Sequence, residues 1–440
     1  MSDATQSYAY LHRSSLTDGR LGLETSGGTA LAGPVAHPRF FSGFLTDPAP
    51  AAAGLLAVAK VARTRYFMPI QERVRDPVVT SNGDRLRFES FSACCGVYAR
   101  LDLLSDALDG EMHDRGTTNV DVGEPLRQSL TRIGRDPLHL AVGPDELTVT
   151  TFDGAVVEKK VPLPQRWLRG FAEVQVITAG FEPRVELPAT EAARFLRSLP
   201  KGSRASGAQW AVPAGRSLRL TSRAAAGAVC LPGPQRLEAL APLLPHARAL
   251  RAYGPAVRPG DLPCASAWEL DLPGMRLVLV LSPEVRRGFS GEGAVLDGLT
   301  HDESDADLVG ALLAFEPRVE VDLLADRSGL PADRVRHALT RLGTSGRVGF
   351  DLAEAAYFHR ELPYDAGLAE AMNPRLANAR ALIAAGHVRP DGDLTVVGEQ
   401  RVRFDNGAAT CTCPWWTEYR GSRGKCKHVL AAEIARRADR

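Results

Sequence analysis

Three cysteines and one histidine lie close together near the carboxy-terminal end of the sequence, as Cys411, Cys413, Cys426 and His428. On an extended strand, residues two apart point to the same side, so the first two thiols can bind one ion together. The second pair opens a segment rich in alanine and leucine, which is typical of a helix. Three thiolates and one imidazole match the ligands of a closed tetrahedral zinc site. We therefore predict one structural zinc ion, bound by these four side chains.

Basic side chains surround the predicted zinc site, namely Arg420, Arg423, Lys425 and Lys427. Two interpretations are open. These cations either balance the negative charge of a site with three thiolates, or they contact a partner such as the phosphate groups of a nucleic acid.

The sequence around both ligand pairs resembles the SWIM-type zinc finger. The resemblance is carried by 410–414 and 424–432, and the strand patterns at 394–397 and 401–405 fit the ββα shape of that family. It implies a zinc-binding module of a kind found in transposases, chromatin-remodelling ATPases and ubiquitin-pathway proteins, which is thought to bind DNA or other proteins. Bacterial chains of this kind often occur alongside ATPase and von Willebrand-type partners, so the resemblance also implies an adaptor role.

The composition is that of a soluble globular protein, with 44% hydrophobic and 24% charged residues among 440. The net charge of +1 argues against a protein that coats nucleic acid, although it allows a local basic patch. Arginine far exceeds lysine, which favours an origin in a GC-rich bacterial genome. The first ten residues lack the pattern of a signal peptide, and no apolar stretch is long enough to span a membrane. We expect a cytoplasmic protein with no membrane partner.

The order of expected elements predicts an α+β, multi-domain chain. Its amino-terminal body contains antiparallel strands, with a three-stranded meander at 138–142, 147–152 and 155–161. The expected segments are a loosely ordered arm at 1–48, an α+β body of one or two subdomains at 49–298, a winged-helix-like domain at 301–362, a helical connector at 363–388 and the zinc finger at 389–440.

The segment 301–362 shows the order helix, short helix, helix, β-hairpin, which resembles a winged helix. We expect Leu308, Leu312 and Leu313 to face the interior of its first helix. Arg334, His337 and Arg341 would then lie on the exposed side of the third helix, in a DNA groove or on a solvated surface. Two acidic residues in the hairpin, Asp351 and Glu354, do not suit a DNA-binding wing. Contact with a protein, or a role as a spacer, therefore stays open beside DNA binding.

No catalytic motif is recognisable. The glycine-rich stretch 288–293 lacks the residues of a P-loop or a dinucleotide fingerprint, and the other four cysteines, Cys94, Cys95, Cys230 and Cys264, lack metal-ligand spacing. We expect these cysteines to be buried as small apolar side chains. The functional prediction is a non-enzymatic interaction protein that acts as a protein–protein adaptor. The alternatives are a DNA- or RNA-binding protein that uses its basic finger, and an unrecognised enzyme within 50–295.

Overall fold

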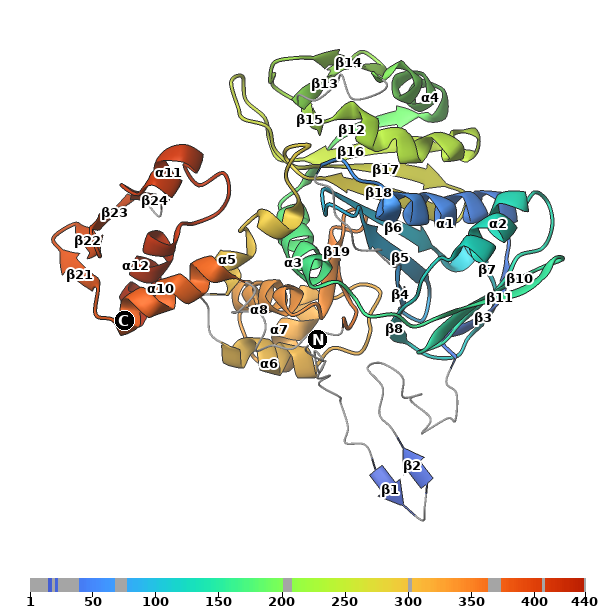
Figure 1. Cartoon of the computed structure of the whole chain (residues 1–440), viewed down its shortest axis with the longest axis horizontal. Coiled ribbons are helices and arrows are strands. Elements are labelled where there is room, and N and C mark those ends of the chain that lie inside the picture. Colours follow the sequence, from blue (N-terminus) through green and yellow to red (C-terminus); the bar gives the residue numbers. More distant parts are fainter. Residues whose placement is uncertain are drawn as a thin grey trace.

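The computed structural model describes residues 15–17, 20–22, 39–67, 77–200, 208–299, 303–362, 373–405 and 408–438 of the chain. Within these residues the fold is a mixture of helices and antiparallel sheets, which confirms the α+β class (Figure 1). None of the described helices combines the length and apolar character that crossing a membrane requires.

An eight-stranded sheet forms the centre of the body, in the order β12-β16-β17-β18-β6-β5-β4-β8. Its middle strands β5, β6 and β18 are buried along their whole length, because both faces of the sheet are covered. In chain order the strands are β4 (Val78–Ser81), β5 (Leu86–Phe91), β6 (Val97–Leu103), β8 (Gly116–Asn119), β12 (Glu182–Pro188), β16 (Ala249–Gly254), β17 (Ser266–Leu272) and β18 (Met275–Leu281).

Three helices share the core on one face of this sheet, α1 (Pro48–Arg63), α4 (Ala189–Ser198) and the 3-10 helix η2 (Pro234–His246). Helix α3 (Gln165–Ala179) covers the opposite face, where Trp167 and Phe171 pack against Phe91 and Tyr98 of the sheet. A smaller sheet, β14-β13-β15, lies beside α4 at the outer end of the body (Figure 1). Its strands are β13 (Ala208–Ala214), β14 (Ser217–Thr221) and β15 (Val229–Pro232).

A five-stranded sheet, β11-β10-β9-β3-β7, packs against α1 and α2 (Glu124–Arg132). The predicted meander is confirmed, because β9 (His139–Val142), β10 (Glu146–Thr151) and β11 (Gly154–Lys159) pair in that order. The expectation of a loosely ordered arm over 1–48 is wrong at its end. There β3 (Phe41–Leu45) pairs with β7 (Leu108–Met112) and β9. Phe41 and Leu45 fill the core on the inner side, and this short alternation was the signal in the sequence. In the same segment, β1 (Ser15–Thr17) pairs with β2 (Arg20–Gly22).

The expected helices and hairpin of 301–362 are present after a short helix α5 (Val295–Gly298). They are α6 (Glu303–Ala311), α7 (Val321–Ser328), α8 (Ala332–Thr344), β19 (Val348–Asp351) and β20 (Ala356–His359). The expectation for Leu308 is wrong, since its side chain is 43% exposed, whereas Leu313 is buried. The hairpin lies on the eight-stranded sheet beside α3, with Leu352 and Leu362 in the same apolar cluster as Phe91 and Phe171. This segment is therefore packed into the body, and the winged-helix interpretation stays a prediction.

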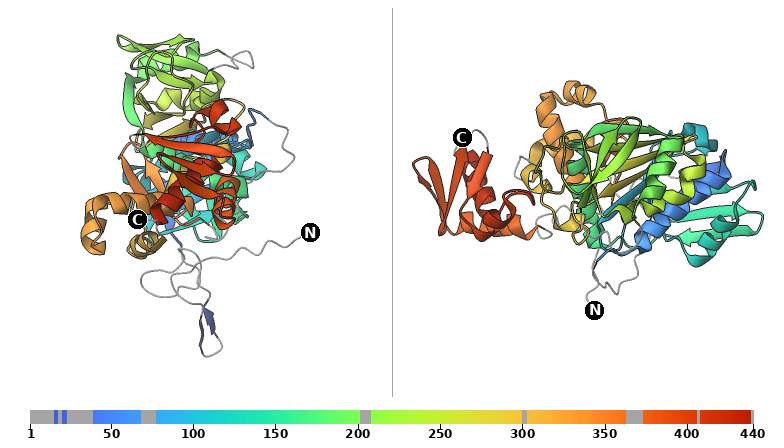
Figure 2. Two further views of the ribbon diagram at one scale, coloured as in Figure 1. Left: turned by 90° about the vertical axis from the view of Figure 1, so that its left-hand side faces the viewer. Right: turned by 90° about the horizontal axis from the view of Figure 1, so that it is seen from above.

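The carboxy-terminal unit stands at one end of the molecule (Figures 1 and 2). The first ten residues of the predicted connector lie outside the described residues, and the rest contains α10 (Pro374–Ala384). The two strands expected from the ββα pattern, β22 (Leu394–Val397) and β23 (Gln400–Asp405), are flanked by two more, so the sheet has the order β21-β22-β23-β24. The remaining elements are β21 (Val388–Asp391), β24 (Ala408–Cys411), α11 (Pro414–Tyr419) and α12 (Lys427–Ala438).

Candidate metal centre

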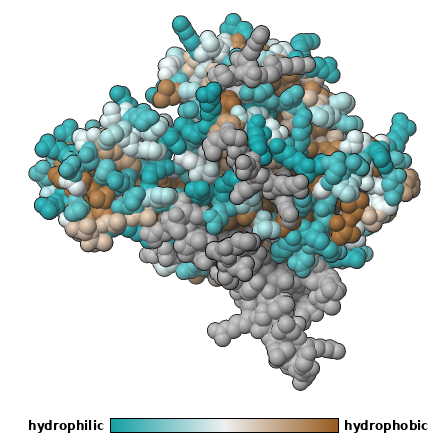
Figure 3. Space-filling model, in the orientation of Figure 1, coloured by the Kyte–Doolittle hydropathy of each residue, from teal (hydrophilic) through white to brown (hydrophobic). Residues whose placement is uncertain are grey.

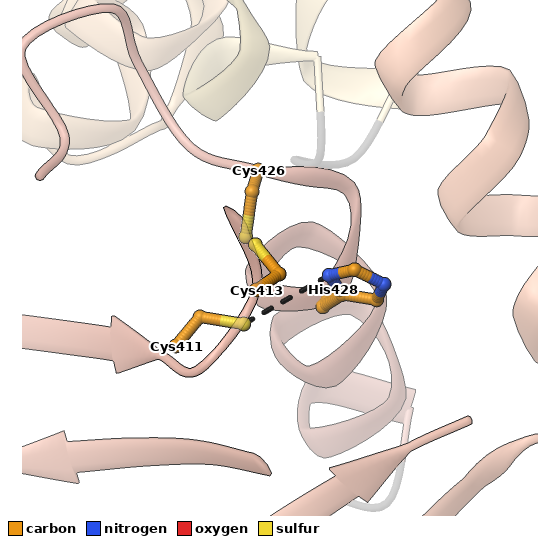
Figure 4. Close-up of side chains that lie close together, drawn as sticks. All are labelled: Cys411, Cys413, Cys426 and His428. Carbon is orange, nitrogen blue, oxygen red and sulfur yellow. Dashed lines mark hydrogen bonds between the residues drawn. The ribbon is translucent and has the colours of Figure 1, made fainter. Parts of the chain in front are cut away.

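The four predicted ligands come together at one end of the four-stranded sheet. Cys411 is the last residue of β24, Cys413 caps α11, and Cys426 and His428 lie at the start of α12. One ligand atom from each residue lies within 4.8 Å of all the others. Figure 4 shows the three sulfur atoms and the His428 ring around a common centre. The two residues of each ligand pair are neighbours in sequence, so the local geometry of one strand end and one helix start is enough to bring their side chains together.

The distances suit a zinc ion. Zn–S bonds of ~2.3 Å and Zn–N bonds of ~2.0 Å place the corners of a tetrahedron about 3.5–3.8 Å apart. Cys411 Sγ lies 3.8 Å from His428 Nδ1. All three cysteines are buried, and His428 is partly buried. Together with the four-donor set, this geometry supports one structural zinc ion in a closed site.

Backbone N–H groups at helix starts stabilise two of the sulfur atoms as thiolates. The N–H of Trp416 donates to Cys413 Sγ at 3.4 Å, and the N–H of Val429 donates to Cys426 Sγ at 3.5 Å. The hydrogen bond from the Cys411 thiol lowers the pKa of Cys426 to about 4.

The other two thiols are held back from ionising. The hydrogen bond that Cys411 donates to Cys426, followed by burial, raises the pKa of Cys411, and burial is the main cause of the raised pKa of Cys413. Three neighbouring thiolates need a positive counter-charge in order to form together. A divalent cation supplies that charge, so the donor chemistry fits the metal as well as the geometry does.

The loop between the two ligand pairs packs against the body. Arg375 of α10 donates from Nη1 to the carbonyl oxygens of Arg423 (2.5 Å) and Lys425 (3.2 Å), and from Nη2 to that of Glu292. Its guanidinium also lies 4.8 Å from the centre of the Trp415 ring. The glycine-rich stretch 288–293 is therefore part of a joint between body, connector and finger. A side chain at Gly424, whose φ is +72°, would place its Cβ 2.3 Å from the carbonyl oxygen of Gly293.

Of the four cations predicted to contact a partner, two are engaged within the chain. The Arg423 guanidinium stacks on Trp415 and Tyr419 and donates to the carbonyl oxygen of Gly291 at 3.0 Å. Lys425 forms an ion pair with Glu433 at 2.8 Å. Arg420 and Lys427 are exposed. Partner contact by these four residues stays a prediction.

The three candidates on α8 also differ in their surroundings. Arg334 is exposed and pairs with Asp305, at 2.5 Å between the closest atoms. His337 is exposed, whereas Arg341 is partly buried and donates to the carbonyl oxygen of Leu299 at 3.2 Å. The same helix packs against α3, where Gln175 donates to the carbonyl oxygen of Thr340 at 3.2 Å. The later turns of α8 are therefore covered by the body.

Sequence reasoning missed a set of arginines on the outer side of the finger sheet. Arg389 of β21 and Arg401 of β23 both lie opposite Val396 of β22, and Arg403 lies two residues beyond Arg401. All three arginines are exposed, and within the described part of the chain none of their side chains has an ion pair or hydrogen bond. We call Arg389, Val396, Arg401 and Arg403 the arginine face. The alternation of Arg401, Val402 and Arg403 in a predicted strand was the signal that could have found it.

Comparison with known proteins supports the interpretation of the finger. Residues 394–437 match the family model of the SWIM zinc finger, which confirms the predicted resemblance for this segment. No curated protein matches the chain.

Two solved structures show a faint likeness to the chain, each at 10% identity over 56% of it. One is proliferating cellular nuclear antigen from Entamoeba histolytica, covered over 99% of its length with a TM-score of 0.36. The other is a PCNA2-PCNA3 complex from Sulfolobus tokodaii, where the matched chain is covered over 100% with a TM-score of 0.39. At these TM-scores the likeness carries no argument about this chain.

Proposed function

We propose that this chain is a non-enzymatic adaptor that binds a protein partner through its zinc finger. The observation that carries the proposal is the arginine face, which is exposed on the side of the finger sheet opposite α12. The zinc ion, together with α12 packed on the opposite face, would stabilise the four-stranded sheet that presents these arginines.

The composition of this surface favours a protein partner over a nucleic acid. Arginine is enriched in protein interfaces, and here it surrounds the partly exposed aliphatic side chains of Leu394 and Val396. Asp391 and Asp405 lie at the margins of the same sheet, so the surface is only weakly positive in total. An acidic protein surface with apolar side chains at its centre would complement it.

The finger is a better candidate for partner contact than segment 303–362. The hairpin of that segment packs on the body sheet, and α8 is partly covered by α3 and α5. Figure 3 shows that hydrophilic side chains predominate on this view of the finger and the body, with smaller apolar patches between them.

The metal site itself supports a structural role. Four protein ligands fill a tetrahedral zinc ion, which leaves no position for a water molecule or substrate.

Nucleic acid is the second candidate partner. The arginine side chains without acidic partners, together with exposed Arg420 and Lys427, could contact phosphate groups. Such binding would weaken steeply as the salt concentration rises, because phosphate contacts release counterions.

One pair of double variants separates these functions. Arg401→Glu/Arg403→Glu reverses charge on the arginine face, and Arg216→Glu/Arg219→Glu makes the same change at exposed positions near and on β14. We expect purified ATPase and von Willebrand-type proteins of the same genome to bind the wild type and the β14 variant, and the finger variant to bind at least tenfold more weakly.

A fluorescently labelled 20-base-pair DNA and a single-stranded RNA serve as the competing probes, with anisotropy measured from 50 to 200 mM salt. Salt-sensitive binding that is lost in the finger variant, with no protein binding, would replace the protein partner by nucleic acid. If neither class of partner distinguishes the two double variants, the proposed role of the finger surface is wrong.

A further inference from the structure

Two cysteines that are far apart in sequence meet at the small sheet of the body. Cys230 lies on β15 and is 1% exposed, whereas Cys264 lies just before β17 and is partly exposed. The backbone N–H of Cys264 donates to Cys230 Sγ at 3.4 Å, so the two residues are in direct contact. The expectation that the four non-ligand cysteines are buried is confirmed for Cys94, Cys95 and Cys230, whereas Cys264 is partly exposed.

The surroundings hold the two thiols together. Cys230 packs with Trp210, Ala228 and Val257, and Cys264 lies against the same cluster. A disulfide places the two sulfur atoms ~2.05 Å apart, and rotation about the Cα–Cβ bonds can bring the thiols of two residues in contact to that distance. The pair is far from the zinc ligands in sequence and belongs to a different core cluster.

We propose that Cys230 and Cys264 are a redox-modification site, in which peroxide converts the two thiols into a reversible disulfide. Cys264 reacts first, because it is the more exposed of the two residues. Cys230 is the resolving thiol, since its sulfur already accepts a hydrogen bond from the backbone of Cys264.

The electrostatics of the pair agree with this order. The hydrogen bond from the Cys230 thiol lowers the pKa of Cys264, while the same bond, together with burial, raises the pKa of Cys230. The thiolate is the reactive form of cysteine, so the lowered pKa of Cys264 favours it as the nucleophile.

The reaction balances in two steps. The Cys264 thiolate attacks one oxygen of hydrogen peroxide, the O–O bond breaks, and hydroxide leaves and takes up a proton as water. The resulting sulfenic acid is attacked by the sulfur of Cys230. The S–O bond then breaks, the S–S bond forms, and a second water leaves with the thiol proton. The two thiols supply the two electrons that reduce the peroxide, and a dithiol reductant reverses the change.

The new bond would tie the segment between β16 and β17 to the small sheet. That segment contains Leu262, which is 69% exposed. Disulfides in cytosolic proteins are usually transient and respond to redox conditions, so the predicted cytoplasmic location suits a reversible bond.

Peptide mapping tests the proposal directly. The zinc-loaded full-length chain is treated with hydrogen peroxide, blocked with an alkylating reagent and digested with trypsin without reduction. We expect peptides 224–236 and 252–276 to be joined, and dithiothreitol to separate them. Cys264→Ser should abolish this cross-link, whereas Cys94→Ser, at another buried cysteine of the body, should keep it.

A second variant identifies the thiol that reacts first. In Cys230→Ser the oxidised Cys264 has no resolving partner, so we expect a sulfenic acid that dimedone labels on peptide 252–276. The proposal is wrong if both peptides stay reduced while added glutathione is oxidised, or if the two cysteines join other cysteines instead. It is also wrong if dimedone labels Cys230 in Cys264→Ser but does not label Cys264 in Cys230→Ser.

Discussion

Asp351, at the end of the β19 strand, accepts a hydrogen bond from the guanidinium of Arg87 at 2.8 Å, and both side chains are fully buried. Arg100 and Arg276 also pair with this carboxylate, at 3.1 and 3.0 Å. Asp351 is one of the two acidic residues that argued against a DNA-binding wing. Its counter-charges are the arginines of the body sheet. Its partners come from β5, β6 and β18, which joins segment 303–362 to the body.

Removing the Asp351 carboxylate should strongly destabilise the body. Asp351→Ala leaves three buried guanidinium groups with less counter-charge, and breaking such a network costs about 3–5 kcal/mol. Glu354→Ala is the control, because Glu354 pairs with Arg85 and Arg276 but is partly exposed, and we expect about 1 kcal/mol. Urea unfolding of the zinc-loaded protein measures both. Equal costs for the two variants would contradict the central position of Asp351.

The Asp351 network should also withstand mild acid. Burial alone would raise the pKa of Asp351, but Arg100, Arg87 and Arg276 together hold it well below its usual range. A lowered folded-state pKa contributes stability that is present above the unfolded pKa of ~3.9 and is lost as the pH falls through the folded value. The difference in unfolding free energy between wild type and Asp351→Ala should therefore stay constant from pH 7 to pH 5 and shrink only below about pH 4. A difference that already fades between pH 7 and pH 5 would show that the carboxylate is not held in this way.

Glu173 of α3 should make the protein less stable as the pH rises towards neutrality, which is the opposite of the effect of Asp351. Burial, followed by the charge of Glu292, raises the pKa of Glu173 to about 8. A raised folded-state pKa contributes stability that is complete below the unfolded pKa and is lost as the pH rises to the folded value. Each pKa unit corresponds to ~1.4 kcal/mol. The unfolding free energy should thus fall by a few kcal/mol between about pH 4.5 and pH 8.

Glu173→Gln isolates this contribution. The amide oxygen of glutamine can still accept the N–H groups of Ala294 and Val295, which Glu173 accepts at 2.8 and 3.4 Å. We expect the variant to show a flatter profile in urea unfolding from pH 5 to pH 8. Parallel profiles for wild type and variant would mean that Glu173 does not titrate in this range.

Removal of zinc should unfold the finger and leave the body folded. Binding free energies of structural zinc sites are about 10–16 kcal/mol in small fingers, which exceeds what the short apolar core here can replace. Hydrogen exchange after treatment with a chelator should show lost protection over 388–438 and unchanged protection in β5 and β6. Cys426→Ser should give the same pattern without a chelator. Full protection of α12 in the metal-free protein would rule out a structural role for zinc.

Arg375→Ala tests the joint between finger and body. The change removes the donor to three backbone carbonyl groups, and we expect a loss of about 2–4 kcal/mol of local stability. Hydrogen exchange should quicken in 288–295 and 420–425 while zinc content stays at one ion per chain. Asn378→Ala, at an exposed position of the same helix, serves as the control. If the two variants exchange alike, Arg375 does not hold the joint.

The zinc site was predictable because all of its determinants are local. Cys411 and Cys413 lie at the end of one strand, and Cys426 and His428 lie at the start of one helix. Strand and helix geometry alone bring such neighbours together. The meander was predictable for the same reason, since its turns and alternating side chains are read from adjacent residues.

Other parts of the expected organisation needed contacts between distant residues. The strand β3 is short and finds its partners in β7 and β9, more than sixty residues away. The Cys230–Cys264 pair likewise depends on how β15 approaches the segment before β17. The alternation at 41–45 indicates a strand, but no local pattern identifies the partners of β3 or of Cys230.

By itself, the sequence determined that the chain has an α+β fold and ends in a four-ligand zinc finger, because periodicity and ligand spacing are properties of neighbouring residues. Only the tertiary structure decided which charged side chains are buried and which residues they pair with. Asp351 and Arg87 are 264 positions apart, and their burial together holds the strands of the hairpin against the body sheet. A charged residue shows its sign in the sequence, but its partner and its burial depend on which distant strands the folded chain places beside it.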